Sequence, residues 1–353
     1  MLYWLHEQLH IHILGYISIR AGISFFLALI LTLIFLPIFI RWAQRTSSVQ
    51  PINEWAPERH QEKAATPTMG GIVFITSTII ASLLTIKFSN LYAVGGILTL
   101  LLFTLIGFQD DFAKIRKSEN LAGLKVRTKL ALQVFSALLI SFFLCFVADF
   151  NTDFYLPFLK NPLFNMGTFS LILWITAIVA TSNAVNLTDG LDGLASVPSI
   201  IALFTLSIII YAIGHIKISA YLLLPHLNIG EVVIIASALS GALFAFLWHN
   251  CHPAEVFMGD SGSLAIGAFL GYLAIISKSE ILLILIGSIF VIETLSVILQ
   301  VGSFKLRKKR IFLMAPIHHH FEMKNWAENK IIVRFWIIAI LSNLIALISL
   351  KIR

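Results

Sequence analysis

Five aspartates in three short stretches are the residues of this chain best placed to do chemistry. Asp110 and Asp111 are adjacent, Asp189 and Asp192 each precede a glycine, and Asp260 lies in a Gly-Asp-Ser-Gly-Ser sequence. Each stretch lies where a long apolar run ends or begins. Mg2+ usually binds through one or two carboxylates together with substrate phosphates. The pattern therefore predicts a metal and phosphate site at a membrane surface.

The composition is that of a membrane protein. Hydrophobic residues make up 58% of the 353 positions and charged residues 12%, with a mean hydropathy of +0.90, whereas soluble domains average about 25% charged residues. The loops are short, so we expect one polytopic membrane domain over residues 1–353. Residues 1–22 lack the basic start and cleavage site of a signal peptide. We expect them to form an interfacial or periplasmic segment.

The apolar runs predict an all-α integral membrane protein with about ten transmembrane helices and an active-site cleft at its cytoplasmic face. A helix needs about 20 mostly apolar residues to cross the hydrocarbon core. The shortest of the ten candidate runs extends from Thr168 to Thr181. The expected spans begin near Ile23, Gly70, Leu91, Leu130, Thr168, Ala195, Glu231, Gly262, Ile281 and Ile332.

The distribution of basic residues predicts the orientation. Of the 25 lysines and arginines, four lie in residues 41–63, six in 114–129 and seven in 305–330. Lys/Arg-rich loops face the cytoplasm, so the loops after odd-numbered spans are expected there and both termini are expected in the periplasm. All five aspartates fall on the cytoplasmic side in this arrangement.

Asp110 and Asp111 directly follow the apolar run 91–108, where we expect a helix to end. Adjacent carboxylates repel, and the helix dipole disfavours negative charge at a C-terminus, so a cation is needed nearby. A divalent metal or Lys114 could supply it, and the two acids could divide the roles of base and charge stabiliser. The alternative is a solvated loop neutralised by the basic residues that follow.

The stretch Asn183–Gly193 contains two Asp-Gly pairs, which predict tight turns. Such turns would direct carboxylates and asparagine amides into one small volume, where they could recognise a base or a ribose. A simple turn with the N-cap of the next span is the alternative. Asp260 has the same two interpretations, because it could cap a helix or belong to a phosphate and metal site at the helix N-terminus.

Two further clusters lie in loops on the same side. Lys63 and Thr68 precede an expected span, which suits pyrophosphate contacts or a capped helix entry. Three consecutive histidines, His318, His319 and His320, could face phosphate or sugar, bind zinc, or form an idle loop. The convergence of five polar clusters on one side favours a site over chance.

Taken in order, these motifs resemble the bacterial phospho-N-acetylmuramoyl-pentapeptide transferase family, within the polyprenyl-phosphate N-acetylhexosamine-1-phosphate transferase superfamily. The triple histidine followed by Phe-Glu is similar to the muramoyl-pentapeptide branch rather than the N-acetylglucosamine branch. The matching stretches are Thr66–Gly71, Asp110–Asp111 with Lys114, Gly123–Leu124 followed by Arg127 and Lys129, Asn183–Gly193, Phe257–Ser263 and Ala315–His320.

The resemblance implies a reaction and its partners. Phospho-N-acetylmuramoyl-pentapeptide would pass from UDP-N-acetylmuramoyl-pentapeptide to undecaprenyl phosphate, giving lipid I and UMP. The family resemblance also implies Mg2+ as cofactor, the bacterial inner membrane with its lipid as location, a homodimer, and no nucleic acid. The alternatives are a sister N-acetylglucosamine-1-phosphate transferase and, more remotely, a cation-coupled transporter. A transporter needs ionisable groups near the bilayer midplane, where the sequence offers Glu293.

The resemblance also implies residue roles. Asp260 would hold the metal, Asp110 would position or deprotonate the acceptor phosphate, and Asp111 would shape the field, with His318 completing the catalytic set. The expected substrate-binding residues are Lys63, Thr68, Lys114 and Lys129 for phosphates, Asn186, Asp189, Asp192, Asn250 and Phe257 for uridine, and Asn183, His319 and His320 elsewhere on the substrates.

Overall fold

Long apolar helices form almost all of the protein. The computed structural model describes residues 1–45, 66–117 and 123–352. Within these ranges nine helices are long and apolar enough to cross a membrane, and a tenth apolar helix, α3 (Gly70–Thr85), has 16 residues. At about 1.5 Å per residue α3 is about 24 Å long, slightly less than the hydrocarbon thickness. The predicted all-α integral membrane class is confirmed.

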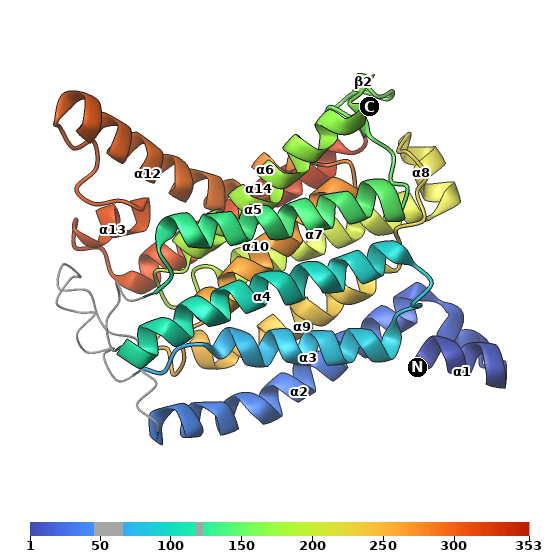
Figure 1. Ribbon diagram of the computed structural model, residues 1–353, viewed down its shortest axis with the longest axis horizontal. Coiled ribbons are helices and arrows are strands. Elements are labelled where there is room, and N and C mark those ends of the chain that lie inside the picture. Colours follow the sequence, from blue (N-terminus) through green and yellow to red (C-terminus); the bar gives the residue numbers. More distant parts are fainter. Residues whose placement is uncertain (46–65, 118–122, 353) are drawn as a thin grey trace.

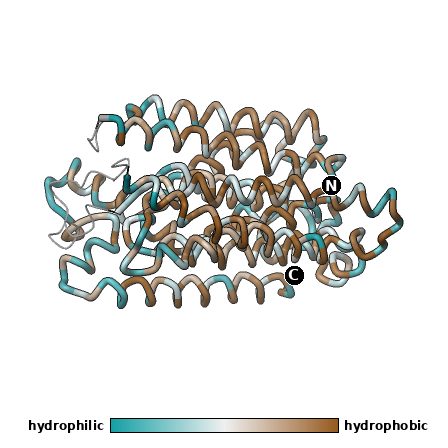
Figure 2. Tube along the Cα trace, turned by 90° about the horizontal axis from the view of Figure 1, so that it is seen from below, coloured by the Kyte–Doolittle hydropathy of each residue, from teal (hydrophilic) through white to brown (hydrophobic). Residues whose placement is uncertain are grey.

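The helices lie side by side, with polar connections at both ends. Figure 2 shows hydrophobic residues along the middle of the bundle and hydrophilic residues toward its ends. The nine candidate spans are α2 (Ile17–Arg45), α4 (Leu91–Lys117), α5 (Val126–Phe142, continued by a π-helical turn to Val147), α6 (Ser170–Thr188), α7 (Ser196–Gly214), α9 (Val232–Asn250), α10 (Gly259–Ile276), α12 (Ser288–Arg307) and α14 (Glu328–Ser349).

Short elements connect the spans. They are α1 (Leu2–Leu9), α8 (Ile216–Leu222), α11 (Leu282–Ile286), α13 (Ile317–Glu322), the 3-10 turns His12–Gly15 and Gly167–Phe169, and the antiparallel strands β1 (Asp153–Phe154) and β2 (Phe164–Asn165). Figure 1 shows α1, α8 and β2 at one end of the bundle and α13 at the other. Lys351 donates to the carbonyl of Tyr221 in α8, so both ends of the chain lie at the same end of the bundle.

Helix α10 is the central helix of the bundle. Every residue from Ser261 to Ile276 is buried, and α3, α4, α6 and α7 pack around it. Two glycines let neighbouring backbones approach closely: a Cβ on Gly71 would collide with Gly262, and a Cβ on Gly107 would collide with the Asp260 carbonyl. Small residues at such crossings are typical of helix packing in membranes. These contacts bring α3 and α4 against the first turn of α10.

Two expectations about where helices end were wrong. Helix α4 continues through Asp110 and Asp111 to Lys117, so the aspartates are not at a helix C-terminus. A salt bridge between Asp110 and Lys114, one turn apart, supports the continued helix. Asn183 and Asn186 belong to α6, which extends to Thr188, beyond the expected end of the apolar run at Thr181, while the turns predicted at Asp189–Gly190 and Asp192–Gly193 are present.

Several span boundaries also differ from the expected ones. The first span begins at Ile17 rather than near Ile23. The run that started at Thr168 extends to Thr188, which makes it a full-length span. The span expected near Ile281 is interrupted at Gly287, between α11 and α12. Apolar composition does not reveal such breaks, because both sides of Gly287 are equally apolar.

Replacing Gly71 by alanine should lower the free energy of unfolding by about 1–3 kcal/mol, because overpacking forces the backbones of α3 and α10 apart. Thermal unfolding in detergent measures the effect. Gly302→Ala in α12 is the matched control, since nothing lies within 4 Å of its added Cβ, and alanine is favoured over glycine in helices by about 1 kcal/mol. Equal unfolding temperatures for the two variants would contradict the close approach.

Candidate active site

Three of the five aspartates meet where α4 approaches the start of α10. Carboxylate oxygens of Asp110, Asp111 and Asp260 all lie within 4.8 Å of one another. Asp110 and Asp111 are buried, whereas Asp260 is partly exposed. The collision that a Cβ on Gly107 would cause shows how closely α4 passes the Asp260 backbone. The fold therefore brings together two stretches that are far apart in the sequence.

Asp111 holds the N-terminus of α10. Its two oxygens accept the backbone N–H groups of Asp260 at 3.0 Å and Ser261 at 2.9 Å. The first N–H groups of a helix lack internal partners, and a carboxylate there also complements the helix dipole. Gly259 has φ of +73°, and an added Cβ would lie 2.7 Å from Asp111 Oδ2. Asp260 is in the first turn after the N-cap residue Met258, so its interpretation as an N-cap was wrong.

Two lysines neutralise part of this charge. Lys114 Nζ lies 2.6 Å from Asp110 Oδ2 and 2.9 Å from Asp260 Oδ2. Lys129 Nζ lies 2.6 Å from Asp260 Oδ2 and 3.4 Å from Asp110 Oδ2. Asp110 also accepts the backbone N–H of Leu124 at 2.7 Å. The cluster holds three carboxyl groups and two ammonium groups, so it offers more oxygen ligands than the lysines occupy.

Asn186 and Asp189 border the cluster from α6. The Asn186 amide donates to Asp260 Oδ1 at 2.6 Å and to Ser263 Oγ at 2.9 Å. Asp189 directly follows α6. Burial, with the neighbouring carboxylates of Asp260, Asp111 and Asp192, raises the pKa of Asp189 well above its usual value. Asn186 and Asp189 thus lie next to the other aspartates, where the sequence predicted that the stretch Asn183–Gly193 would be.

Asn250 and Phe257 join the polar loops to one another. Asn250 Oδ1 accepts from the Gly193 N–H and the Ser196 hydroxyl, both at 3.1 Å. Its amide donates to the Val256 carbonyl at 2.9 Å. Phe257 donates its N–H to the Pro67 carbonyl at 2.8 Å and accepts from the Gly70 N–H at 3.0 Å.

Thr68 and Asp192 lie at the edges of these loops. Thr68 is buried beside Gly259, since a Cβ on that glycine would be 3.2 Å from the Thr68 hydroxyl. Asp192 Oδ2 accepts the Ala254 N–H at 3.1 Å and lies 3.1 Å from His252 Nδ1. Thr68 is therefore next to the first turn of α10, while Asp192 faces the loop between α9 and α10.

Asn183 lies apart from the carboxylates. Its amide donates to Gln133 Oε1 and to the Val179 carbonyl, both at 2.8 Å, which links α5 to α6. Its predicted contact with substrate stays a prediction. Lys63 lies outside the residues that the structure describes.

The three histidines have different neighbours. His318 is fully buried, with Nδ1 3.1 Å from Glu293 Oε1. His319 Nδ1 lies 2.6 Å from Glu322 Oε2, and His320 Nδ1 accepts the Leu313 N–H at 3.1 Å. Among the described residues, no candidate metal cluster includes any of these histidines. This arrangement does not favour a shared zinc ion.

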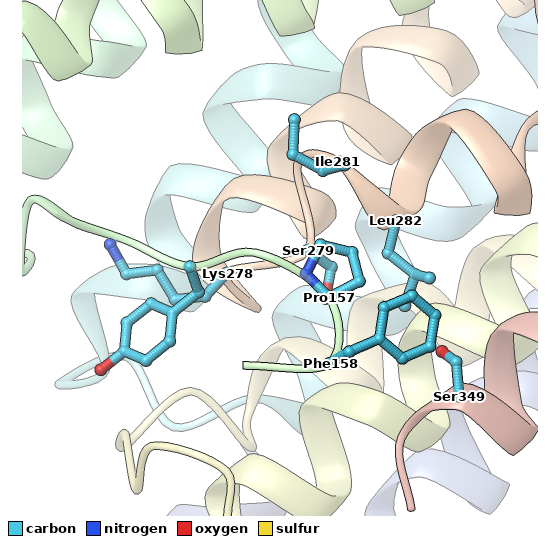
Figure 3. Close-up of a pocket in the computed structure, with 8 residues that line it drawn as sticks. Pro157, Phe158, Lys278, Ser279, Ile281, Leu282 and Ser349 are labelled. Carbon is cyan, nitrogen blue, oxygen red and sulfur yellow. The ribbon is translucent and has the colours of Figure 1, made fainter. Parts of the chain in front are cut away.

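A largely apolar groove of about 360 Å³ runs along α6 beside α11 and the first turns of α12, with Leu270 of α10 also in its lining. Its lining on α6 extends from Leu173 to Ala184, two residues before Asn186. A second cavity, of about 10 Å³, lies beside Lys278. Figure 3 shows Phe158 next to Leu282 and Ser349 in that cavity. Its volume suffices for about one water molecule, so the groove is the larger feature of the two.

Comparisons with known proteins identify the family. Residues 93–278 match the model of glycosyl transferase family 4, and residues 63–75 match signature 1 of phospho-N-acetylmuramoyl-pentapeptide-transferase. A protein of that name from Sulfurimonas denitrificans is 76% identical over 353 residues, with 100% of both chains covered. The chain belongs to the phospho-N-acetylmuramoyl-pentapeptide-transferase family.

Other relatives with the same name also align over the full length. The protein from Aliarcobacter butzleri is 64% identical and that from Campylobacter jejuni strain 81116 is 57% identical, each with 100% of both chains covered. The family resemblance stated from the motifs is confirmed. These alignments include all the helices described above.

The carboxylate cluster fits a Mg2+ ion of the kind expected in this family. Mg2+ prefers oxygen ligands and often keeps several waters with only one or two protein carboxylates. The oxygens of all three carboxylates accept hydrogen bonds inside the protein, those of Asp260 from Asn186, Lys114 and Lys129, and Asp260 is the partly exposed member. Its partial exposure makes Asp260 the most accessible of the three carboxylates, and its assignment as the metal ligand stays a prediction.

Two features of the site escaped the sequence analysis. A Cβ on Gly190 would collide with the His318 ring, so this glycine lets the histidine pack against the Asp189 turn. Glu293 was visible as an ionisable residue inside a span, a recognised sign of function. Its partner was not visible, because the contact with His318 depends on the fold of the loop between α12 and α14.

Asp189→Asn should be more stable than the wild type at pH 8 in a metal chelator, and the difference should vanish near pH 4. The raised pKa means that the folded state favours the protonated form of Asp189. The wild type therefore loses stability as pH rises from the pKa of an unfolded aspartate, about 3.9, through the higher pKa of Asp189 in the folded protein, whereas the uncharged asparagine does not. Thermal unfolding in detergent across this pH range measures the difference.

Asp153→Asn is the control, because the pKa of Asp153 is shifted in the opposite direction. Hydrogen bonds from Asn151 and Asn165 lower the pKa of Asp153, so its charged form is favoured in the folded state. This substitution should give no gain in stability at pH 8. Parallel pH profiles for the wild type and Asp189→Asn would contradict the raised pKa.

Proposed function

We propose that the protein transfers phospho-N-acetylmuramoyl-pentapeptide from its UDP-linked donor to undecaprenyl phosphate, forming lipid I and UMP. An oxygen of the acceptor phosphate forms a bond to the sugar-linked phosphorus, and the bond from that phosphorus to UMP breaks. The main supporting observation is the cluster of three carboxylates and two lysines beside an apolar groove, in a chain 76% identical to a relative with that name.

Positioning and charge neutralisation supply most of the catalysis in phosphoryl transfer. Lys114 and Lys129 bind substrate phosphates from their positions around Asp260. Asp260 would hold Mg2+, which would supply positive charge to offset that of the donor pyrophosphate. Asp110 accepts hydrogen bonds from both lysines and from Leu124, which favours a role in positioning the lysines over deprotonation of the acceptor.

The donor and acceptor reach this cluster from different sides. Asn186, Asp189, Asp192, Asn250 and Phe257 border the donor nucleotide. The groove along α6 receives the polyprenyl chain of the acceptor, because it is apolar and its lining ends two residues before Asn186. An acceptor seated there has its phosphate near Lys129 while its chain stays out of water.

The basic loops support an active site on the cytoplasmic face of the inner membrane, with both termini periplasmic. The described helices that lead into the three basic-rich segments, α2, α4 and α12, all end at the same end of the bundle as the carboxylates (Figure 1), and a site there would be accessible to a cytosolic nucleotide. A homodimer remains part of the proposal by family membership.

Asp260→Ala should lower UMP release by about 100-fold or more, because a group that offsets charge in the transition state is lost. The assay uses vesicles with undecaprenyl phosphate, Mg2+ and radiolabelled donor. Asp153→Asn, at the opposite end of the bundle, should keep the wild-type rate. A near-wild-type rate for Asp260→Ala would refute the assignment of the metal to this residue.

The same vesicles separate the two sister activities. Labelled UDP-N-acetylmuramoyl-pentapeptide should give a lipid-linked product, and labelled UDP-N-acetylglucosamine should give none. Product from UDP-N-acetylglucosamine alone would place the protein in the sister activity instead.

A further inference from the structure

Glu293 and His318 form a fully enclosed pair between α12 and α13. Both side chains are 0% exposed, and His318 Nδ1 lies 3.1 Å from Glu293 Oε1. Within the described residues, none of the side-chain oxygens and nitrogens of this pair makes a hydrogen bond. Burying a polar group without a partner is costly. Each of the two side chains therefore depends on the other for its placement.

The other side of the His318 ring faces the donor-binding loop. A Cβ on Gly190 would collide with His318 Nε2 and Cε1. Gly190 follows Asp189, whose carboxylate interacts with those of Asp260 and Asp111. His318 is thus clamped between Glu293 and the turn that borders the carboxylate cluster. Any shift of Glu293 is transmitted through this ring to the turn.

A second contact fixes the same loop to the same face of α12. Gln300 donates to the Phe312 carbonyl at 2.9 Å and accepts the N–H groups of Ile311 and Phe312 at 3.0 and 2.9 Å. Glu293 and Gln300 are seven residues apart, about two helical turns, so they share one face. Figure 1 shows α12 slanting away from the other helices, with α13 beside it.

A neighbouring face of α12 lines the apolar groove. Phe290, Val291 and Thr294 belong to its lining, whereas Glu293 does not. At about 100° per residue, Phe290 lies about 60° around the helix from Glu293, Thr294 about 100° and Val291 about 160°, so the groove side adjoins the face of Glu293 and Gln300. One helix therefore contacts both the groove and the histidine loop.

We propose that Glu293 is a positioning residue for the transfer reaction: it holds His318 against the Asp189–Gly190 turn from a helix that also contacts the polyprenyl chain of the acceptor through its adjoining side. This inference rests on the proposed function. A long chain that fills the groove fixes α12, and the enclosed pair then fixes the turn next to the carboxylate cluster. A short chain leaves α12 without that support.

The test compares undecaprenyl phosphate with geranyl phosphate, a two-isoprene acceptor, in detergent micelles. The wild type should show a higher kcat with the long acceptor. Glu293→Gln keeps the size of the side chain but removes its charge. It should lower kcat with undecaprenyl phosphate by about tenfold to 100-fold, as a small misplacement does, and lower kcat with geranyl phosphate much less. The KM for the donor should stay within about twofold.

Two further variants separate positioning from folding. Gln300→Ala removes the second contact between α12 and the loop, at a partly exposed position. Like Glu293→Gln, it should lower the ratio of kcat with undecaprenyl phosphate to kcat with geranyl phosphate. Glu231→Gln breaks another buried pair, with Arg20 at 2.5 Å, near the opposite end of the bundle. It should lower the unfolding temperature and leave the ratio at the wild-type value.

The outcomes are distinguishable. A Glu293→Gln enzyme that is slower with both acceptors by the same factor would show a structural role only and overturn the proposal. A wild type that does not discriminate by chain length would overturn it as well. A wild type that forms no lipid-linked product from either acceptor would instead refute the proposed function.

Discussion

The carboxylate of Asp111 is the contact on which the active site depends most. It accepts the N–H groups of the second and third residues of α10, at a place where three helices already meet through glycines. Such groups need a protein partner when they are shielded from water. The same contact fixes the backbone of Asp260, so the direction of the carboxylate proposed to bind the metal is set by a residue of α4. Because α10 is buried along nearly its whole length, it cannot tilt to compensate for the loss of this contact.

The charge balance around Asp260 explains how one cluster serves both stability and catalysis. Two lysines hold three carboxylates together in the free protein, and breaking a buried pair of this kind by removing one partner costs about 3–5 kcal/mol. In the proposed function, substrate phosphates offer the same lysines new acceptors, while a metal ion offers the carboxylates a new cation. Binding would therefore exchange the partners of these charged groups.

Much of this could be predicted from the sequence. Apolar runs gave the helices, and residue types gave the family and the convergence of Asp110, Asp111 and Asp260. Local patterns failed where tertiary contacts decide. The apolar run ends at Phe108, but α4 continues because Lys114 and the start of α10 stabilise the aspartates. The contact of Glu293 with His318 was equally hidden, since it depends on the path of a whole loop.

The most direct test of the role of Asp111 is a Mn2+ titration of the purified protein, followed by electron paramagnetic resonance, with Mn2+ as a probe for the Mg2+ site. Asp111→Ala should weaken Mn2+ binding by about tenfold or more while Asp260 is intact, because groups that orient a metal ligand typically contribute about 10–100-fold to affinity. Equal Mn2+ affinity in Asp111→Ala and the wild type would contradict the claim that this carboxylate positions Asp260.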